Sequence, residues 1–305
     1  MGWEEEFIKA LQAIANPALD AFFRAVTELG GDLFWLLVIA ICFSLGRRRQ
    51  AVSLSVLVVT CFYVSYALKY IIMRPRPPAE LQRTDVIGEP KVGPSLPSTH
   101  ATEAAANLSY TARELRTAWS YVACAILAGL AALSRVYLGI HWPTDVLAGL
   151  GLGLLISVLY ILAIEGRLAG KARLIEERRA YLVLVPIALG LLAALLTPQE
   201  WGRPSTYIGG LIAGAFSGAL MSGPIGARDP RDRSNIIRTF ACVLIGFLGL
   251  AASYKLGFGP AQFIAAALTG LWISWIGPVA LWAIGGQKGA VSGGQSGLTA
   301  PSQGH

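Results

Sequence analysis

The amino-acid sequence predicts an all-α integral membrane protein, a bundle of about nine transmembrane helices. Hydrophobic residues make up 54% of the 305 residues and charged residues only 14%, with a mean hydropathy of +0.57. A soluble domain would carry about 25% charged residues. The apolar residues also fall in long runs, whereas the helices of soluble proteins carry a narrower apolar stripe. Basic residues are concentrated in the short segments between these runs.

Residues 1–30 predict two short amphipathic helices that lie in the membrane interface rather than cross the membrane. Apolar residues recur at helical spacing on both sides of a break at Asn16-Pro17. Asp20, Arg24 and Glu28 make this segment too polar for the hydrocarbon core. An amphipathic segment packed on the rest of the chain is the alternative interpretation. The glutamates that follow Trp3 are the opposite of the basic start of a secretory signal peptide.

Nine apolar runs follow, and each predicts one transmembrane helix, with eight or ten spans as alternatives. They cover residues 32–45, 51–72, 99–112, 119–137, 143–165, 181–197, 205–222, 238–254 and 261–284. A helix of about 22 residues rises about 33 Å, which is enough to cross the hydrocarbon layer.

The charged segment 166–180 divides the chain into two predicted membrane domains, at 31–165 and at 181–284. We interpret this segment as a solvated cytoplasmic linker. The second domain has four spans and no predicted role. Its glycines at 210, 214 and 218 repeat every fourth residue, which favours close helix packing inside the chain or between two copies. The Gly/Ser/Gln-rich tail at 285–305 predicts disorder.

The distribution of basic residues predicts the orientation of the chain. Fifteen of the 25 Lys and Arg residues fall on one side if the spans alternate from segment 46–50 onward. The positive-inside rule assigns that side to the cytoplasm. It therefore predicts a multi-pass protein of the cell membrane with an extracytoplasmic N-terminus. The charge of +7 is explained by these loops, so we expect no nucleic-acid partner.

Three polar clusters stand at the ends of apolar runs, all on the predicted extracytoplasmic side. They are Lys69 with Arg76-Pro77, Pro97-Ser98-Thr99-His100, and Ser134-Arg135 with His141 and Asp145. Two of the chain's three histidines belong to them. Ionisable groups at such positions are costly and usually functional. We expect the clusters to converge into one site that handles phosphate.

The residue types in these clusters suit phosphoryl chemistry. Cations at Lys69, Arg76 and Arg135 can hold phosphate oxygens, and arginine binds them with a planar fork. Ser98 adds a hydroxyl, and the free N–H groups of a helix that starts there add further donors. One imidazole can attack and another can donate a proton near neutral pH. Asp145 lies four residues after His141, where it can orient the ring.

Each cluster has a simpler interpretation when it is considered alone. Lys69 and Arg76 could extend their charged ends to the membrane surface. Ser98 and His100 could mark an ordinary helix start, and His141 with Asp145 could be a structural pair. The three clusters together, at span ends on one predicted face, favour a common site.

At these residues the sequence resembles the type-2 phosphatidic acid phosphatases, the lipid phosphate phosphatases. Their signature is Lys-x6-Arg-Pro, then Pro-Ser-Gly-His, then Ser-Arg-x5-His-x3-Asp, and this chain matches it over roughly residues 17–165. Thr99 stands where the family usually has glycine, and its Cβ narrows the possible loop geometry. The resemblance implies that His141 forms a phosphohistidine, that Asp145 orients it and that His100 protonates the leaving group. It also implies that Lys69, Arg76, Ser98, Thr99 and Arg135 bind the phosphoryl group.

The resemblance implies hydrolysis of a lipid phosphate or diphosphate that enters from the bilayer. Polyprenyl diphosphates, phosphatidate and phosphatidylglycerophosphate all fit. The additional cations Arg74, Arg83 and Lys91 are compatible with a diphosphate. A lipid-linked phosphotransferase that uses the same site, or a lipid transporter or scramblase, is the alternative.

No cofactor or metal is expected from the sequence. The four cysteines fall inside apolar runs, where they pack as small hydrophobic residues. Their spacing matches neither a disulfide framework nor a metal site.

Overall fold

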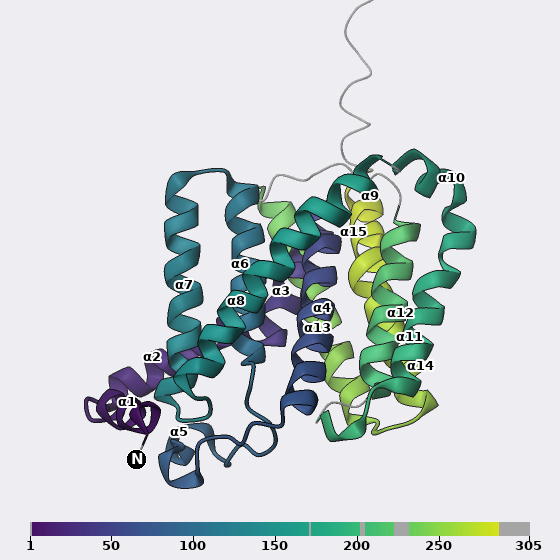
Figure 1. Ribbon diagram of the computed structural model, residues 1–305. Helices are drawn as coiled ribbons and strands as arrows, with labels where there is room; N and C mark the ends of the chain where they lie inside the picture. Colours follow the sequence, from purple (N-terminus) through teal and green to yellow (C-terminus); the bar gives the residue numbers. More distant parts are fainter. Residues whose placement is uncertain (1, 171, 202–204, 223–231, 287–305) are drawn as a thin grey trace, which may run out of the picture. The chain divides into compact units, whose positions relative to one another are not determined.

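The computed structural model describes residues 2–170, 172–201, 205–222 and 232–286, which contain helices and no strand. The chain divides into two compact units (Figure 1). Unit 1 comprises Met1–Cys42 and Arg48–Glu177, and unit 2 comprises Phe43–Arg47 and Arg178–His305. The all-α prediction is confirmed for the described residues.

Unit 1 contains the following helices, without the last two residues of α3 and together with the first part of α10 (Ala172–Leu182): α1 (Trp3–Gln12), α2 (Pro17–Thr27), α3 (Asp32–Ser44), α4 (Arg48–Ile72), α5 (Thr84–Ile87), α6 (Thr99–Leu115), α7 (Ala118–Tyr137), α8 (Pro143–Leu159) and α9 (Gly166–Gly170). A π-helical stretch, Tyr160–Glu165, continues α8. Local chemistry sets several starts. The Asn16 side chain accepts hydrogen bonds from the first N–H groups of α2, and Thr117 and Ser120 form a capping box on α7.

Six helical segments of the described chain are long and apolar enough to cross a membrane. They are Arg48–Ile72, Ala118–Tyr137, Pro143–Glu165, Glu177–Leu196, Arg233–Lys255 and Pro260–Ala280. The pair Pro17–Gly30 and Asp32–Ser44, bent by 57°, would make a seventh if it forms one span. The chain is a multi-pass membrane protein, but the expected nine spans are not confirmed.

The difference in count has a physical reason at two of the helices. Helix α6 is enclosed by α4, α7 and α8, so it does not need the apolar surface of a lipid-facing span. Its buried positions accordingly include Glu103 and Asn107. Helix α12 (Ser205–Met221) is apolar but has only 17 residues.

Two glycines let α8 pack closely on α6. A Cβ at Gly149 would lie 2.7 Å from the carbonyl oxygen of Ser98, and one at Gly153 would lie 2.2 Å from that of Thr102. Only glycine permits such an approach between helix backbones. The contact brings the start of α8 next to the start of α6.

Helix α1 packs against the end of unit 1 that also carries α2 and α5 (Figure 1). Ile8 is fully buried in a cluster that contains Leu81 and Val136. The amide of Gln12 donates to the backbone oxygens of Leu81 and Tyr137, at 2.8 and 2.9 Å. Trp3 on the same helix remains 59% exposed. One face of α1 is therefore anchored in the unit, and its place in a membrane interface stays a prediction.

Unit 2 contains the part of α10 (Ala172–Leu182) from Arg178 onward and all of α11 (Leu184–Leu196), α12, α13 (Arg233–Lys255), α14 (Pro260–Leu271) and α15 (Gly277–Gly286). The glycine repeat of α12 packs inside the chain. A Cβ at Gly210 would lie 2.3 Å from the oxygen of Phe263, and one at Gly214 would lie 1.9 Å from that of Ala267. The predicted linker 166–180 is helical where it is described. The predicted tail 285–305 lies outside the described residues from 287 onward, and α15 extends to Gly286.

Candidate active site

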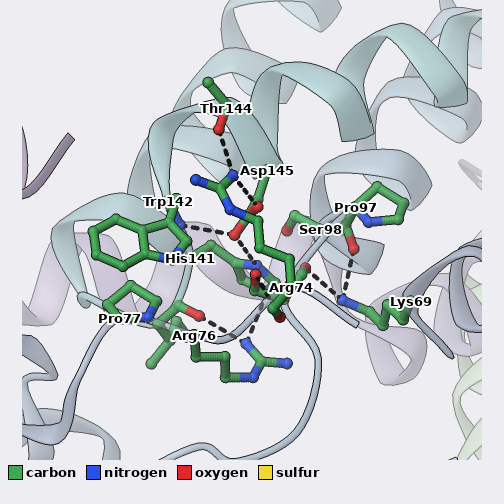
Figure 2. Close-up of polar contacts among 12 residues, drawn as sticks. Lys69, Arg74, Arg76, Pro77, Pro97, Ser98, His141, Trp142, Thr144 and Asp145 are labelled. Carbon is green, nitrogen blue, oxygen red and sulfur yellow. Dashed lines mark hydrogen bonds and ion pairs between the residues drawn. The ribbon is translucent and has the colours of Figure 1, made fainter. Parts of the chain in front are cut away.

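The structure brings the three polar clusters to one end of unit 1. Lys69 lies in the last turn of α4, and Arg135 lies in the last turn of α7. Ser98 caps the start of α6, and His141 stands just before the start of α8. Arg76 lies in the loop that follows α4 (Figure 2).

His141 is the centre of this arrangement, and its ring is held at both nitrogens. Nδ1 lies 3.4 Å from Oδ2 of Asp145, and Nε2 lies 3.1 Å from Nη1 of Arg76 (Figure 2). Because a guanidinium can only donate, Nε2 must accept, which assigns the proton of the neutral ring to Nδ1. The lone pair of Nε2 therefore faces the cationic side of the site.

Asp145 is fully buried and has several donors besides His141. Its Oδ2 accepts from the backbone N–H of Trp142 at 2.9 Å, and its Oδ1 accepts from Arg74 at 2.8 Å. The backbone oxygen of Asp145 accepts from the N–H of Ser98 at 3.0 Å. These bonds hold the carboxylate against the imidazole ring.

Burial lowers the pKa of His141 well below its usual value, and the positive charges of Lys69, Arg76, Arg135 and His100 lower it further. The ring is therefore neutral at physiological pH, as a nucleophile requires. Burial also lowers the pKa of Arg76, although a guanidinium remains charged at any physiological pH.

Three residues of the predicted site each have a buried donor group that can bind an anion. Ser98 Oγ, Thr99 Oγ1 and Arg135 Nε have no hydrogen-bond partner within the described part of the chain. Buried polar atoms without partners are costly in a folded protein, so such a group favours a polar ligand. Another guanidinium nitrogen of Arg135 donates to Thr27 at 2.8 Å, which fixes the side chain.

Lys69 and His100 complete the set of predicted residues. The ammonium of Lys69 donates to the backbone oxygens of Ser95 and Pro97, at 2.8 and 2.6 Å, and so orders the chain before α6. His100 is half-buried in the first turn of α6. A Cβ at Gly30 would lie 2.4 Å from its carbonyl oxygen, so that turn is packed against the chain between α2 and α3.

Arg74 and Arg83, which the sequence left as possible partners of a diphosphate, form ion pairs with carboxylates. Arg74 binds Asp145 and Glu4, and Arg83 binds Asp20 and Asp85. Both guanidinium groups are thus paired with carboxylates of the chain itself. Sequence reasoning missed the contact between Arg74 and Glu4, because nothing local links positions 70 residues apart.

The described residues contain no group of three or more His, Cys, Asp or Glu side chains that could hold a metal ion. The side chains gathered at this site include imidazoles, cations and hydroxyls. Such a set can bind a tetrahedral anion and present the nitrogen of His141 to it.

Comparison with known proteins shows that the part of the chain that contains this site is similar to one protein family. Residues 50–169 match the model of the PAP2 superfamily, and all three clusters lie within that range. Over these residues the chain is similar to the PAP2 superfamily. The resemblance stated above is therefore confirmed, and the match ends before the helices of unit 2 from α11 onward.

Two curated proteins and one solved structure are similar to this chain over about half of its length. An undecaprenyl-diphosphatase of Sulfolobus acidocaldarius is 28% identical over 165 residues, which are 53% of this chain and 78% of that protein. Lipid phosphate phosphatase delta of Arabidopsis thaliana is 27% identical over 169 residues, 50% of this chain but only 40% of the relative. The crystal structure of a PAP2-type phosphatidylglycerolphosphate phosphatase from Bacillus subtilis is 29% identical, covers 51% of this chain and 81% of its own, and has a TM-score of 0.45.

Proposed function

We propose that this protein is an integral-membrane lipid phosphatase that works through a phosphohistidine on His141. The observation that carries the proposal is the position of the His141 ring. Its Nδ1 faces the buried carboxylate of Asp145, and its Nε2 faces Arg76 among further cations. The match to the PAP2 superfamily supports the same reaction class.

The reaction would proceed in two steps. Nε2 of His141 attacks phosphorus, the ester P–O bond breaks, and His100 protonates the oxygen of the leaving lipid alcohol. Water then attacks the phosphorus of the phosphohistidine while His100 takes a proton from the water, the P–N bond to His141 breaks, and inorganic phosphate leaves. Lys69, Arg76, Arg135, Ser98 and Thr99 would hold the phosphoryl oxygens. Asp145 would stabilise the positive charge that His141 acquires.

The substrate class would be a phosphate ester or diphosphate on a lipid that reaches the site from the bilayer. The Arabidopsis relative is named a lipid phosphate phosphatase, and the Sulfolobus relative an undecaprenyl-diphosphatase. Of the three additional cations noted in the sequence, Arg74 and Arg83 are engaged by carboxylates. They therefore give no reason to prefer a diphosphate, and we rank monoesters such as phosphatidate first.

The active site would face away from the cytoplasm. This orientation rests on the concentration of Lys and Arg in the loops at the opposite ends of the spans. Accessibility of a cysteine introduced at exposed Val92 to an impermeant thiol reagent in intact cells tests it. If the cysteine is labelled only after the cells are permeabilised, the active site faces the cytoplasm and the proposed orientation is wrong.

The decisive experiment measures phosphate released by purified protein from a panel of lipid phosphates in the presence of EDTA. It compares wild type with His141→Ala and with His305→Ala, which changes the histidine outside the clusters. Release by wild type and His305→Ala, but not by His141→Ala, would support the proposal. A folded wild type that releases no phosphate would contradict it.

Phosphotransfer and lipid transport are tested with the same preparations. A lipid or sugar acceptor that becomes phosphorylated in a His141-dependent way would identify a phosphotransferase. Lipid flux that persists in His141→Ala liposomes would identify a transport activity independent of this chemistry.

A further inference from the structure

Arg74 joins two carboxylates that lie far apart in the sequence. Its Nη2 lies 2.5 Å from Oε2 of Glu4 in α1, and its Nη1 lies 2.8 Å from Oδ1 of Asp145 in α8. Figure 2 shows Arg74 between Asp145 and Thr144. The side chains of Glu4 and Arg74 are 17% and 25% exposed, and that of Asp145 is 0% exposed. Such shielded pairs are weakened little by solvent.

Thr144 closes this arrangement into a ring. Oε1 of Glu4 accepts from the hydroxyl of Thr144 at 2.7 Å and from its backbone N–H at 3.2 Å. Nη1 of Arg74 also lies 2.5 Å from the hydroxyl of Thr144. Buried Ile8 and the hydrogen bonds of Gln12 hold α1 in place, so Glu4 is delivered to Arg74 by a fixed helix.

Glu4 changes the net charge of the group formed by Glu4, Arg74 and Asp145, which lies next to His141. Burial alone would raise the pKa of Glu4, but hydrogen bonds from Thr144 and the charge of Arg74 outweigh it and lower the pKa. Ionised Glu4, Arg74 and Asp145 then carry a net charge of −1. Without Glu4 the group would be neutral, because Arg74 would cancel Asp145. Without Arg74 the group would carry −2.

We propose that Glu4 and Arg74 are positioning residues that set the orientation and effective charge of Asp145, and through it the proton affinity of His141. The link between this effect on His141 and catalysis rests on the proposed function, in which His141 is the nucleophile. An N-terminal helix outside the matched residues 50–169 would thereby control the reactivity of the PAP2-type site.

The other charges around this group are known and would stay constant in the test. His141 faces Lys69 of α4, Arg76 of the following loop, Arg135 of α7, His100 of α6 and Asp145 of α8. Asp145 faces Arg74 and Lys69 besides His141. Changes confined to Glu4 and Arg74 therefore alter only the charge behind Asp145.

The test compares wild type with Glu4→Gln, Arg74→Gln and the double variant. The control is Glu5→Gln, which removes a neighbouring carboxylate of α1 whose ion pair within the described residues is with Lys9. Histidine NMR with [13Cε1]histidine follows the titration of His141, whose signal is assigned by its loss in His141→Ala. The pH profile of kcat/KM for phosphate release is measured in parallel.

The expected shifts have opposite signs. Arg74→Gln should raise the titration midpoint of His141 on the order of one pH unit, and Glu4→Gln should lower it or move it off the acid end of the range. The double variant restores the net charge of −1, so its midpoint should return toward that of wild type. Glu5→Gln should change neither the midpoint nor the rate.

A shift of both single variants in the same direction, or no shift in Arg74→Gln, would overturn the proposal. A purely structural role would lower the rates without opposite movements of the midpoint. If wild type releases no phosphate, the proposed function fails, yet the NMR titration still decides whether Glu4 and Arg74 act on His141.

Discussion

The backbone N–H of Ser98 donates to the backbone oxygen of Asp145 at 3.0 Å, which joins the start of α6 to the start of α8. This bond connects Ser98, whose hydroxyl has no partner within the described residues, to Asp145, whose carboxylate contacts His141. It forms because Gly149 lets the two helices approach closely. The alignment of Ser98 with the His141–Asp145 pair thus depends on the contact between α6 and α8.

Gly149→Ala should separate these two helix starts. The new Cβ would lie 2.7 Å from the oxygen of Ser98, a backbone atom, so the helices must shift. We expect a destabilisation of about 1–3 kcal/mol and a large loss of phosphate release. Thermal unfolding in detergent and the release assay measure both. Gly151→Ala is the matched control, since nothing lies within 4 Å of its Cβ, and an equal loss there would refute the argument.

Asp145→Asn should lower kcat while the fold is kept. The amide oxygen can still accept from Trp142, but the charge that holds the Nδ1 proton of His141 is lost. We expect kcat to fall about 10²- to 10⁴-fold. Asp85→Asn, which changes a carboxylate that is 63% exposed, serves as the control and should retain activity. Wild-type kcat in Asp145→Asn would remove Asp145 from the mechanism.

Arg76→Lys tests whether the site needs the planar guanidinium group of Arg76 or only its positive charge. Lysine keeps one positive charge but cannot contact His141, the Ile140 oxygen and a phosphoryl oxygen in the same geometry. We expect kcat/KM to fall about 10²- to 10³-fold. Arg24→Lys, at an exposed position of α2, should behave as wild type. A normal rate in Arg76→Lys would show that charge alone suffices.

Phosphate release should continue in EDTA and should be inhibited by orthovanadate. Vanadate adopts the five-coordinate geometry of phosphoryl transfer and would be held by the same cations and hydroxyls. Titration of the release assay with each reagent measures both effects. Activity that EDTA abolishes and Mg²⁺ restores would require a metal in the reaction, and indifference to vanadate would argue against this site.

The buried His141 should make the folded protein sensitive to acid. Its pKa is lowered from 6.5 in the folded state, so the unfolded chain binds the proton more tightly. The associated stability is fully present above pH 6.5 and is lost as the pH falls toward the folded pKa. Thermal midpoints of wild type should therefore drop below pH 6.5 more steeply than those of His141→Gln. If the thermal midpoints of the two proteins fall in parallel as the pH is lowered, the lowered pKa of His141 would be contradicted.

The sequence alone determined the helical class and the members of the three polar clusters. All nine apolar runs coincide with helical segments of the described chain, because apolar periodicity is a local property of the sequence. The spacings from Lys69 to Arg76 and from His141 to Asp145 are also local, so the residues of each cluster could be recognised without a structure. The count of nine spans is not confirmed, since α6 and α12, at 17 residues each, are shorter than the six described helices that are long and apolar enough to cross a membrane.

Only the tertiary structure decided which clusters face one another and which charges are already paired. Arg74 looked like a further phosphate ligand in the sequence, but it lies between Glu4 and Asp145. The physical reason is that an ion pair depends on distance in space, and α1 reaches Arg74 only because Ile8 and Gln12 anchor it across the end of unit 1. Packing of that kind involves residues 70 or more positions apart, for which the order of amino acids carries no local signal.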